Sequence, residues 1–195
     1  MLKPYYNSDS IECGLDEAGR GCLAGPVVAA GVILPLGHGI DELNDSKQLN
    51  KLDREKLAIR IKEKAIAFSI QSCTAQEIDE INILNASILA MHRCVDNLSL
   101  KPEHLLVDGN RFKPYLSIPH TCIVKGDAKF QSIAAASILA KTFRDEFMEK
   151  IAMDFPDYGW QTNAGYPTIM HRKAILSIGS TIWHRKTFRV RLNQN

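Results

Sequence analysis

The chain has 195 residues and a formal net charge of +2, and 45% of its residues are hydrophobic and 24% charged. This composition is ordinary for a globular protein, and the length suffices for one sizeable domain with its own core. The first ten residues, MLKPYYNSDS, contain no apolar signal region, and the longest uncharged stretch, residues 21–39, is interrupted by prolines and glycines. We therefore expect a cytoplasmic protein without a membrane span.

Charge is unevenly distributed along the chain. Residues 158–195 contain six lysines and arginines and no aspartate or glutamate, so that the net charge of +2 leaves −4 for residues 1–157. A basic end on an acidic body favours an anionic partner, although a solvated basic face gives the same pattern. The five cysteines are far apart and form no C-x-x-C pair, which favours reduced, buried thiols over a zinc site or a disulfide framework.

The first part of the chain predicts three strands and one helix. Residues 10–16 predict a strand, and the apolar run VVAAGVIL at 27–34, flanked by prolines, predicts a second. The charged segment 51–64 carries regularly spaced leucine and isoleucine and predicts a helix, and AIAFSIQSC at 65–73 predicts a third strand. Because the connection between the first two strands is short, we expect an antiparallel hairpin.

The middle of the chain begins with a helix start signal. Thr74, followed three residues later by Glu77, has the spacing of a capping box. A second helix is expected over residues 83–97. Short buried strands are expected at 104–109, HLLVDG, and at 120–127, HTCIVKGD.

Two helices are expected in the last part of the chain. In residues 130–151, apolar side chains recur every three or four positions, which predicts one long helix with a continuous apolar stripe. The stripe consists of Phe130, Ile133, Ala136, Ala140, Phe143, Phe147 and Ile151. A further helix is expected from about 167 to 178, ending at Gly179. Strands that cluster early, with helices between and after them, predict an α/β domain with a mixed sheet, in which helical connections favour parallel pairing of the later strands.

Three of the expected strands lead into an aspartate: Asp16, Asp108 and Asp127. Sites in open α/β sheets form at the carboxyl ends of strands. We therefore expect Asp16 and Asp108 to lie side by side if their strands are parallel neighbours, with Asp127 approaching from the start of the long helix. Carboxylates gathered in this way, with Glu17, raise one another's pKa unless a cation neutralises them. Oxygen ligands without histidine or cysteine favour Mg²⁺ or Mn²⁺.

Simpler explanations exist for the same residues. Each acid could cap a helix or a turn, and the six histidines, which lack paired metal-ligand spacing, are expected to be structural or on the surface. Directly after the paired acids come Gly19, Arg20 and Gly21. Glycines allow backbone N–H groups to approach a ligand closely, and Arg20 adds positive charge, so phosphate or ribose is the natural ligand, although glycine pairs also mark ordinary turns.

The chain resembles the ribonuclease HII family, the type 2 ribonucleases H, in a series of motifs that follow one another in the family's order. They are DEAGRG at 16–21 followed by Gly25-Pro26, DSK at 45–47, VDG at 107–109, KGD at 125–127, AAASILAK at 134–141 followed by Arg144-Asp145, GYPT at 165–168 and HRKTF at 184–188. In the last motif, Thr187 stands where serine is commoner in the family. The resemblance covers residues 11 to about 190, nearly the whole chain.

The resemblance implies a ribonuclease H-like α/β fold with a central mixed five-stranded sheet flanked by helices. Residues 1–195 would form a single catalytic domain, with a basic helical C-terminal segment from about residue 158. The implied activity is endonucleolytic cutting of RNA in RNA–DNA hybrids and incision 5′ of single ribonucleotides embedded in duplex DNA. Two Mg²⁺ or Mn²⁺ ions would assist hydrolysis to a 3′-OH and a 5′-phosphate.

The resemblance also implies roles for individual residues. The catalytic and metal-binding carboxylates would be Asp16, Glu17, Asp108 and Asp127. The loop Gly19-Arg20-Gly21 would recognise the ribonucleotide, mainly through backbone contacts to its 2′-OH, and Tyr166 would stack against the neighbouring sugar. Lys47 would contact a phosphate. From their charge, independently of the resemblance, the basic residues from Arg172 onwards are expected to bind the duplex phosphates.

Two other hypotheses are consistent with the sequence. The chain could be another metal-dependent nuclease or a strand-transfer enzyme of the same fold that acts on DNA, or a non-catalytic nucleic-acid-binding protein whose acids are structural. Without the resemblance, Tyr166, between Gly165 and Pro167, would be interpreted as a core tyrosine beside a turn. We expect a monomer whose partner is an RNA–DNA hybrid or a duplex that contains ribonucleotides.

Overall fold

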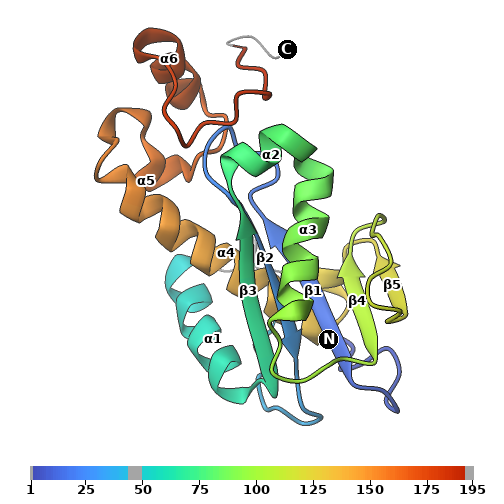
Figure 1. Ribbon diagram of the computed structural model, residues 1–195. Helices are drawn as coiled ribbons and strands as arrows, with labels where there is room; N and C mark the ends of the chain where they lie inside the picture. The colour runs from blue at the N-terminus through green and yellow to red at the C-terminus, as the bar shows by residue number, and fades with distance from the viewer. Residues whose placement is uncertain (1, 44–49, 192–195) are drawn as a thin grey trace.

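A computed structural model describes residues 2–43 and 50–191, and a five-stranded sheet forms its centre (Figure 1). The strands are β1 (Glu12–Ala18), β2 (Val27–Ile33), β3 (Ala67–Cys73), β4 (His104–Asp108) and β5 (His120–Ile123). Their order in the sheet is β3-β2-β1-β4-β5. β1 and β2 form the expected antiparallel hairpin, β3 pairs antiparallel with β2, and β4 pairs parallel with β1 and β5. The predicted mixed five-stranded sheet is confirmed.

Helices cover both faces of the sheet (Figure 1). They are α1 (Lys51–Lys64), α2 (Ala75–Ile81), α3 (Ile83–Asp96), α4 (Gln131–Ala152), α5 (Trp160–Asn163) and α6 (Ile169–Ile178), with the 3₁₀ turns η1 (Gly126–Ala128) and η2 (Pro156–Tyr158). Alternate residues of β2 belong to different cores: Val27 and Ala29 pack in the cluster that includes α3, whereas Val28 and Ala30 pack in the cluster that includes α1 and α4. This alternation is typical of a strand that is buried on both faces.

Local sequence signals explain where several helices begin and end. The Asn50 side chain accepts a hydrogen bond from Asp53 N and caps α1. Thr74 and Glu77 form the predicted capping box at the start of α2. α6 ends at Ile178, directly before Gly179, as predicted. None of the helices in the described ranges is both long enough and apolar enough to cross a membrane.

The structure differs from the sequence predictions at three places. β1 continues to Ala18, which pairs with Val28 in the hairpin, so that Asp16 lies inside the strand and not at its end. β5 ends at Ile123, and Asp127 lies in η1. The predicted apolar stripe of α4 is wrong at Phe143, whose side chain is exposed. Where α4 extends beyond the sheet, other residues of the helix are buried, among them Arg144 and Met148.

The end of α4 and the segment that follows it pack together beyond one end of the sheet (Figure 1). A separate apolar cluster there contains Met148 of α4, Tyr158, Trp160 and Ala24 of the β1–β2 connection. The predicted helical C-terminal segment is thus present, with two short elements, η2 and α5, that the sequence did not predict. The five cysteines are free and four of them are buried, as expected.

Candidate active site

The register of β1 and β4 brings two carboxylates together. Leu15 pairs with Val107 in the parallel ladder, and Asp16 and Asp108 are the next residues on each strand. Leu15 and Val107 pack in the core beneath α3, so the residues that follow them face the opposite side, toward α4. There the side chain of Ser137 in α4 forms a hydrogen bond with Asp16, which is only 5% exposed.

The carboxylates of this site repel one another. Burial raises the pKa of Asp16 well above its usual range, and the charges of Glu17 and Asp108 raise it further, while the hydrogen bond from Ser137 opposes the shift. Burial likewise raises the pKa of Glu17, against the opposing effect of Arg20, whose Nη1 lies 3.0 Å from Glu17 Oε1. At Glu17 the effect of Arg20 exceeds the repulsion by Asp108, whereas at Asp16 the charges of Glu17 and Asp108 add to the effect of burial.

Asp127 lies in η1 and is 3% exposed. Its Oδ1 accepts a hydrogen bond from Ala128 N at 3.0 Å. The preceding residue, Gly126, donates its N–H to Asp108 Oδ1 at 2.6 Å and so binds η1 to the end of β4. A Cβ on Gly126 would lie 2.6 Å from Ile133 Cδ1, so a larger residue there would require that methyl group to move.

The donor set fits a hard divalent cation. In the described residues, no group of three or more His, Cys, Asp or Glu side chains already has the arrangement of a metal site. Burial raises the pKa of Asp16 and of Glu17, and at Asp16 the negative charges of Glu17 and Asp108 add to the shift. A cation with oxygen ligands, such as Mg²⁺ or Mn²⁺, would relieve that repulsion.

A cavity opens next to the carboxylates, between the end of β4 and α3. Its volume is about 160 Å³. It is lined by Glu17, Arg20, Leu84, Ser87, Ile88, Met91, Asp108, Gly109, Asn110 and Arg111. Asn110 and Arg111 follow the VDG motif directly but belong to none of the motifs. Two arginines on its wall give this acidic site a positively charged border.

The two glycines of the loop after β1 have different surroundings. Gly19 has φ +93°, and a Cβ on it would lie 2.0 Å from Arg144 Nε, so the fold itself demands glycine there. Gly21 is exposed, and a Cβ on it would meet no atom of the described residues within 4 Å. Within the described residues, no packing constraint requires glycine at position 21. The close approach of a ligand to the backbone of Gly21 would explain it.

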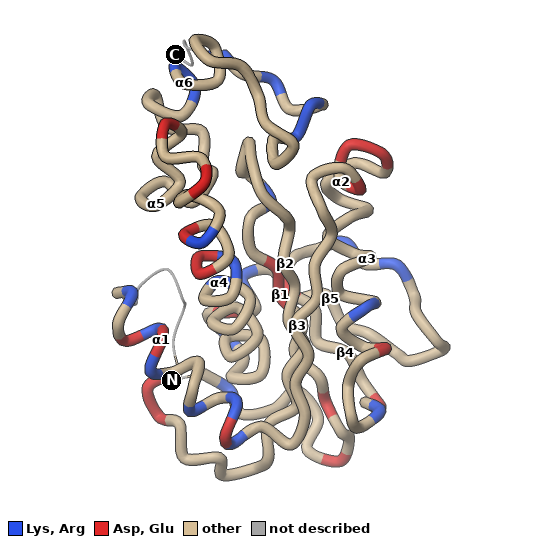
Figure 2. Tube along the Cα trace, turned by 60° about the vertical axis from the view of Figure 1, so that its left-hand side comes forward, with Lys and Arg blue, Asp and Glu red and all other residues tan. Residues whose placement is uncertain are grey.

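Two buried arginines, Arg144 and Arg185, hold this loop. The sequence motifs did not indicate this role for either of them. Arg144 donates to the carbonyl oxygens of Pro26, Ala24 and Ala164 at 3.0, 3.0 and 2.8 Å. Arg185 donates to those of Gly25, Arg20 and Gly19 at 3.0, 2.9 and 2.7 Å. The expectation that Arg185 grips duplex phosphates is wrong, because its side chain is buried against these carbonyls. The exposed basic residues of the C-terminal segment are Lys173, Lys186, Arg189 and Arg191 (Figure 2).

Tyr166 stands next to the same loop. Its ring is 39% exposed, with Lys141 Nζ 5.4 Å and Arg144 Cζ 5.9 Å from the ring centroid. The adjacent Gly165 carbonyl accepts a hydrogen bond from Leu23 N at 2.8 Å. Tyr166 is therefore a half-exposed residue on the surface near the candidate site and not a core residue. Lys47, the candidate phosphate contact, lies outside the described residues.

Two histidines form a buried pair that the sequence spacing did not reveal. His171 Nε2 and His184 Nε2 lie 3.1 Å apart, and Trp160 Nε1 donates to His171 Nε2 at 3.0 Å. The ring of His171 also contacts the Tyr166 carbonyl through Nδ1, at 2.9 Å. These contacts support the predicted structural role of both histidines.

Comparison with known proteins agrees with the motifs. The family model described as Ribonuclease HII matches residues 13–194. The chain is 59% identical to a ribonuclease HII of Christiangramia forsetii over 186 residues, which are 95% of this chain and 94% of that protein. The ribonuclease H2 of Pyrococcus horikoshii has a similar structure, with a TM-score of 0.76 and 26% identity over 92% of this chain and 94% of that one.

A more distant structure shares the fold alone. Bst ribonuclease HIII, solved in complex with Mn²⁺, is 18% identical, with a TM-score of 0.72, and the match covers 92% of this chain and 67% of that one. The family match, by contrast, spans nearly the whole chain and includes the carboxylates, the glycine loop and Tyr166. The chain therefore belongs to the ribonuclease HII family and is a ribonuclease H, an endonuclease that hydrolyses nucleic acid.

Proposed function

We propose that this ribonuclease H cuts the RNA strand of RNA–DNA hybrids and also incises duplex DNA on the 5′ side of a single embedded ribonucleotide, leaving a 3′-OH and a 5′-phosphate. The observation that carries the proposal is the position of Asp16 and Asp108, side by side on β1 and β4, directly before the loop that contains Gly19 and Gly21. The carboxylates and the backbone N–H groups that recognise the ribose would then lie within one site.

Asp16, Glu17, Asp108 and Asp127 would hold two divalent ions, Mg²⁺ or Mn²⁺. When bound, such ions activate water as the nucleophile and stabilise the charge that develops on the phosphate and the leaving oxygen. The ribonuclease HIII that shares this fold was solved with Mn²⁺, which fits this choice. The Ser137 hydroxyl would orient Asp16, and Gly126 N–H would orient Asp108 through the 2.6 Å hydrogen bond to its Oδ1.

Recognition of the ribonucleotide would depend on the loop and on Tyr166. The 2′-OH is the one group that distinguishes a ribonucleotide within a DNA strand. The open side of Gly21 supports an approach of the sugar to the backbone N–H groups of this loop. A site that hydrogen-bonds this hydroxyl leaves its own polar groups unpaired when the hydroxyl is missing, and so rejects the deoxyribonucleotide.

Binding of the duplex itself would be electrostatic. Lys173, Lys186, Arg189 and Arg191 are exposed on the C-terminal segment, which contains no acidic residue from position 158 onward. Contacts of lysine and arginine with phosphates are independent of sequence and weaken as the salt concentration rises. These residues would therefore position the duplex, whereas the loop and Tyr166 would select the cleavage site.

A cleavage assay on three matched duplexes tests the proposal. One contains a single ribonucleotide, one is an RNA–DNA hybrid and one is DNA only, each labelled at the 5′ end. We expect nicking of the first two with Mg²⁺ or Mn²⁺, with the cut 5′ of the ribonucleotide, and none after EDTA. Equal cutting of the DNA-only duplex, or cutting that persists in EDTA, would contradict the proposal.

A further inference from the structure

The orientation of the glycine loop is set by a side chain that comes from the other end of the protein. Arg185 is 2% exposed and donates to the carbonyl oxygens of Gly19 and Arg20 at 2.7 and 2.9 Å. Burial lowers the pKa of its guanidinium to about 10, so it stays charged at neutral pH and its hydrogen bonds are charge-assisted. Residues of the C-terminal segment thus hold a loop that immediately follows β1.

These two hydrogen bonds determine where the loop's amides point. A trans peptide is planar, with its N–H and C=O on opposite sides. When Arg185 holds the carbonyls of Gly19 and Arg20, the N–H groups of Arg20 and Gly21 are turned away from it. A Cβ on Gly21 would meet no described atom within 4 Å. The guanidinium therefore fixes the direction of two backbone donors in a loop whose Gly21 is exposed.

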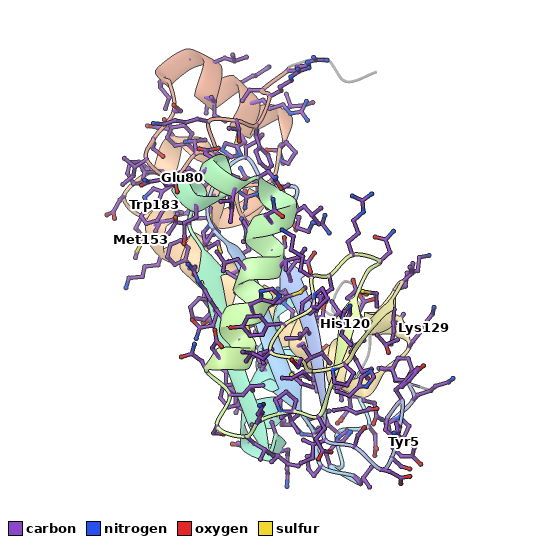
Figure 3. All side chains as sticks on the ribbon, turned by 45° about the vertical axis from the view of Figure 1, so that its right-hand side comes forward. Tyr5, Glu80, His120, Lys129, Met153 and Trp183 are labelled. Atoms are coloured by element: carbon purple, nitrogen blue, oxygen red, sulfur yellow. The ribbon has the colours of Figure 1, made fainter. Side chains whose placement is uncertain are left out.

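The segment that carries Arg185 is itself fixed to α2. Asp79 accepts hydrogen bonds from Lys186 N at 2.8 Å, from Thr187 N at 2.9 Å and from Thr187 Oγ1 at 2.6 Å. Partial burial opposes ionisation of Asp79, but the hydrogen bonds from Thr187 and Lys186 outweigh it and lower the pKa of this carboxyl. In Figure 3, Glu80 marks α2 and Trp183 marks the C-terminal segment that Asp79 holds.

A second connection leads from the same segment to Tyr166. His184 Nδ1 accepts from Thr181 N at 2.8 Å, which leaves Nε2 to donate to His171 Nε2 at 3.1 Å. Because His171 Nε2 accepts, its Nδ1 carries the proton and donates to the Tyr166 carbonyl at 2.9 Å. Adjacent residues, His184 and Arg185, thus reach the backbone of both candidate recognition elements.

We propose that residues 181–187, held in place by Asp79 of α2, form a brace that sets the spacing and orientation of the Gly19–Gly21 amides and of Tyr166. We call it the C-terminal brace. Asp79 and Arg185 are then positioning residues for ribonucleotide selection, although neither touches the substrate. This inference rests on the proposed function, because it assumes that the loop and Tyr166 read the ribonucleotide.

Two variants test the brace from different ends. Arg185→Lys keeps the positive charge but cannot reproduce the three-carbonyl fork. Asp79→Ala removes the anchor on α2, outside the site. In each, we expect the single-turnover rate of nicking at one embedded ribonucleotide to fall about 10- to 100-fold, as for a small misplacement of recognition groups. Affinity for the DNA-only duplex, measured with Ca²⁺, should stay unchanged, because the exposed lysines and arginines remain.

Two further variants complete the experiment. Glu80→Ala removes the neighbouring carboxylate on the same helix, which accepts a hydrogen bond from Gln76 Nε2 at 2.9 Å, and should leave the nicking rate unchanged. Asp79→Asn keeps an acceptor oxygen and should recover part of the rate lost in Asp79→Ala. Thermal unfolding of every variant shows whether the assays were made on folded protein.

The possible failures are distinguishable. If the unmodified protein nicks at the ribonucleotide and both variants nick equally fast, the brace inference fails while the proposed function stands. A parallel loss of nicking and of DNA-only affinity, or failure of both variants to fold, would show a general structural role and also overturn it. If the unmodified protein does not nick at the ribonucleotide, the proposed function fails, and the inference fails with it.

Discussion

Asp16 and Asp108 are neighbours because Leu15 pairs with Val107 in the parallel β1–β4 ladder. The two aspartates are 92 residues apart in the sequence, yet one backbone register fixes their separation. Burial and the charges of Glu17 and Asp108 together raise the pKa of Asp16. The protein thus keeps a repulsive arrangement in its fold, as is expected where a bound cation compensates for it.

Replacing Asp108 by asparagine should almost abolish cutting and leave binding intact. Asparagine keeps the oxygen that accepts from Gly126 N, so η1 should stay in place. The substitution removes a negatively charged ligand of the proposed ions. We expect kcat to fall by about 100-fold or more, as for the loss of a group that stabilises transition-state charge. The assay pairs single-turnover cleavage with duplex affinity. Normal turnover in Asp108→Asn would remove this residue from the active site.

The two glycines of the loop should respond differently to alanine. Gly19→Ala forces a Cβ against Arg144 at positive φ, and we expect it to lower the free energy of unfolding by at least about 1 kcal/mol. Gly21→Ala meets no described atom, so its stability should stay within about 0.5 kcal/mol of the unmodified protein. Its nicking rate at a ribonucleotide should nevertheless fall about 10-fold, because the methyl group obstructs the sugar. Unchanged nicking in Gly21→Ala would refute a ligand on this side.

Tyr166→Ala should slow nicking at a single ribonucleotide more than it weakens duplex binding. Loss of stacking on an aromatic ring costs about 1–3 kcal/mol, which is roughly a 10- to 100-fold effect. Tyr166→Phe retains the ring and serves as the matched control, with a much smaller loss expected. Both variants are compared with the unmodified protein in rate and in affinity for the DNA-only duplex. Equal rates for the alanine variant and the unmodified protein would exclude the stacking role.

The buried histidine pair should make stability depend on pH. Burial, with a smaller contribution from the charge of His171, lowers the pKa of His184 from 6.5 to about 4. Between these values the unfolded chain binds a proton that the folded protein does not, so the free energy of unfolding rises with pH. We expect His184 to remove roughly 3 kcal/mol of stability between pH 7 and pH 4.

Urea unfolding at several pH values measures this effect. His184→Gln cannot take up the proton, and its free energy of unfolding should depend less on pH between 6.5 and 4 than that of the unmodified protein. Because both proteins keep every other titrating group, the difference in slope reports on His184 together with its interaction with His171. Parallel slopes would show that His184 titrates normally in the folded protein.

Much of the architecture could be predicted because it rests on local signals. The capping box of Thr74 and Glu77, the apolar run of β2 and the glycine after α6 each act within a few residues. Asp16 and Asp108 were expected to be neighbours only if their strands pair in parallel, and β1 and β4 do so. The motifs then led to a family that the comparisons confirmed. The prediction that Phe143 belongs to the buried stripe was wrong, because the apolar periodicity does not show where a helix extends beyond its sheet.

The contacts that organise the loop could not be predicted, because they join distant parts of the chain. Arg185 lies 166 residues from Gly19, and its sequence context is that of a basic, solvated segment. Asp79 and Thr187 are 108 residues apart, and His171 and His184 have no spacing typical of a metal site or a helix face. A guanidinium that binds carbonyl oxygens and one that binds phosphates look the same in a sequence.

Anomalous diffraction from crystals grown with Mn²⁺ would locate the ions. We expect manganese peaks between Asp16 and Asp108, within ligand distance of Glu17 or Asp127, and their loss in Asp108→Asn. Manganese bound only elsewhere on the molecule, with these four carboxylates left without an ion, would contradict this expectation.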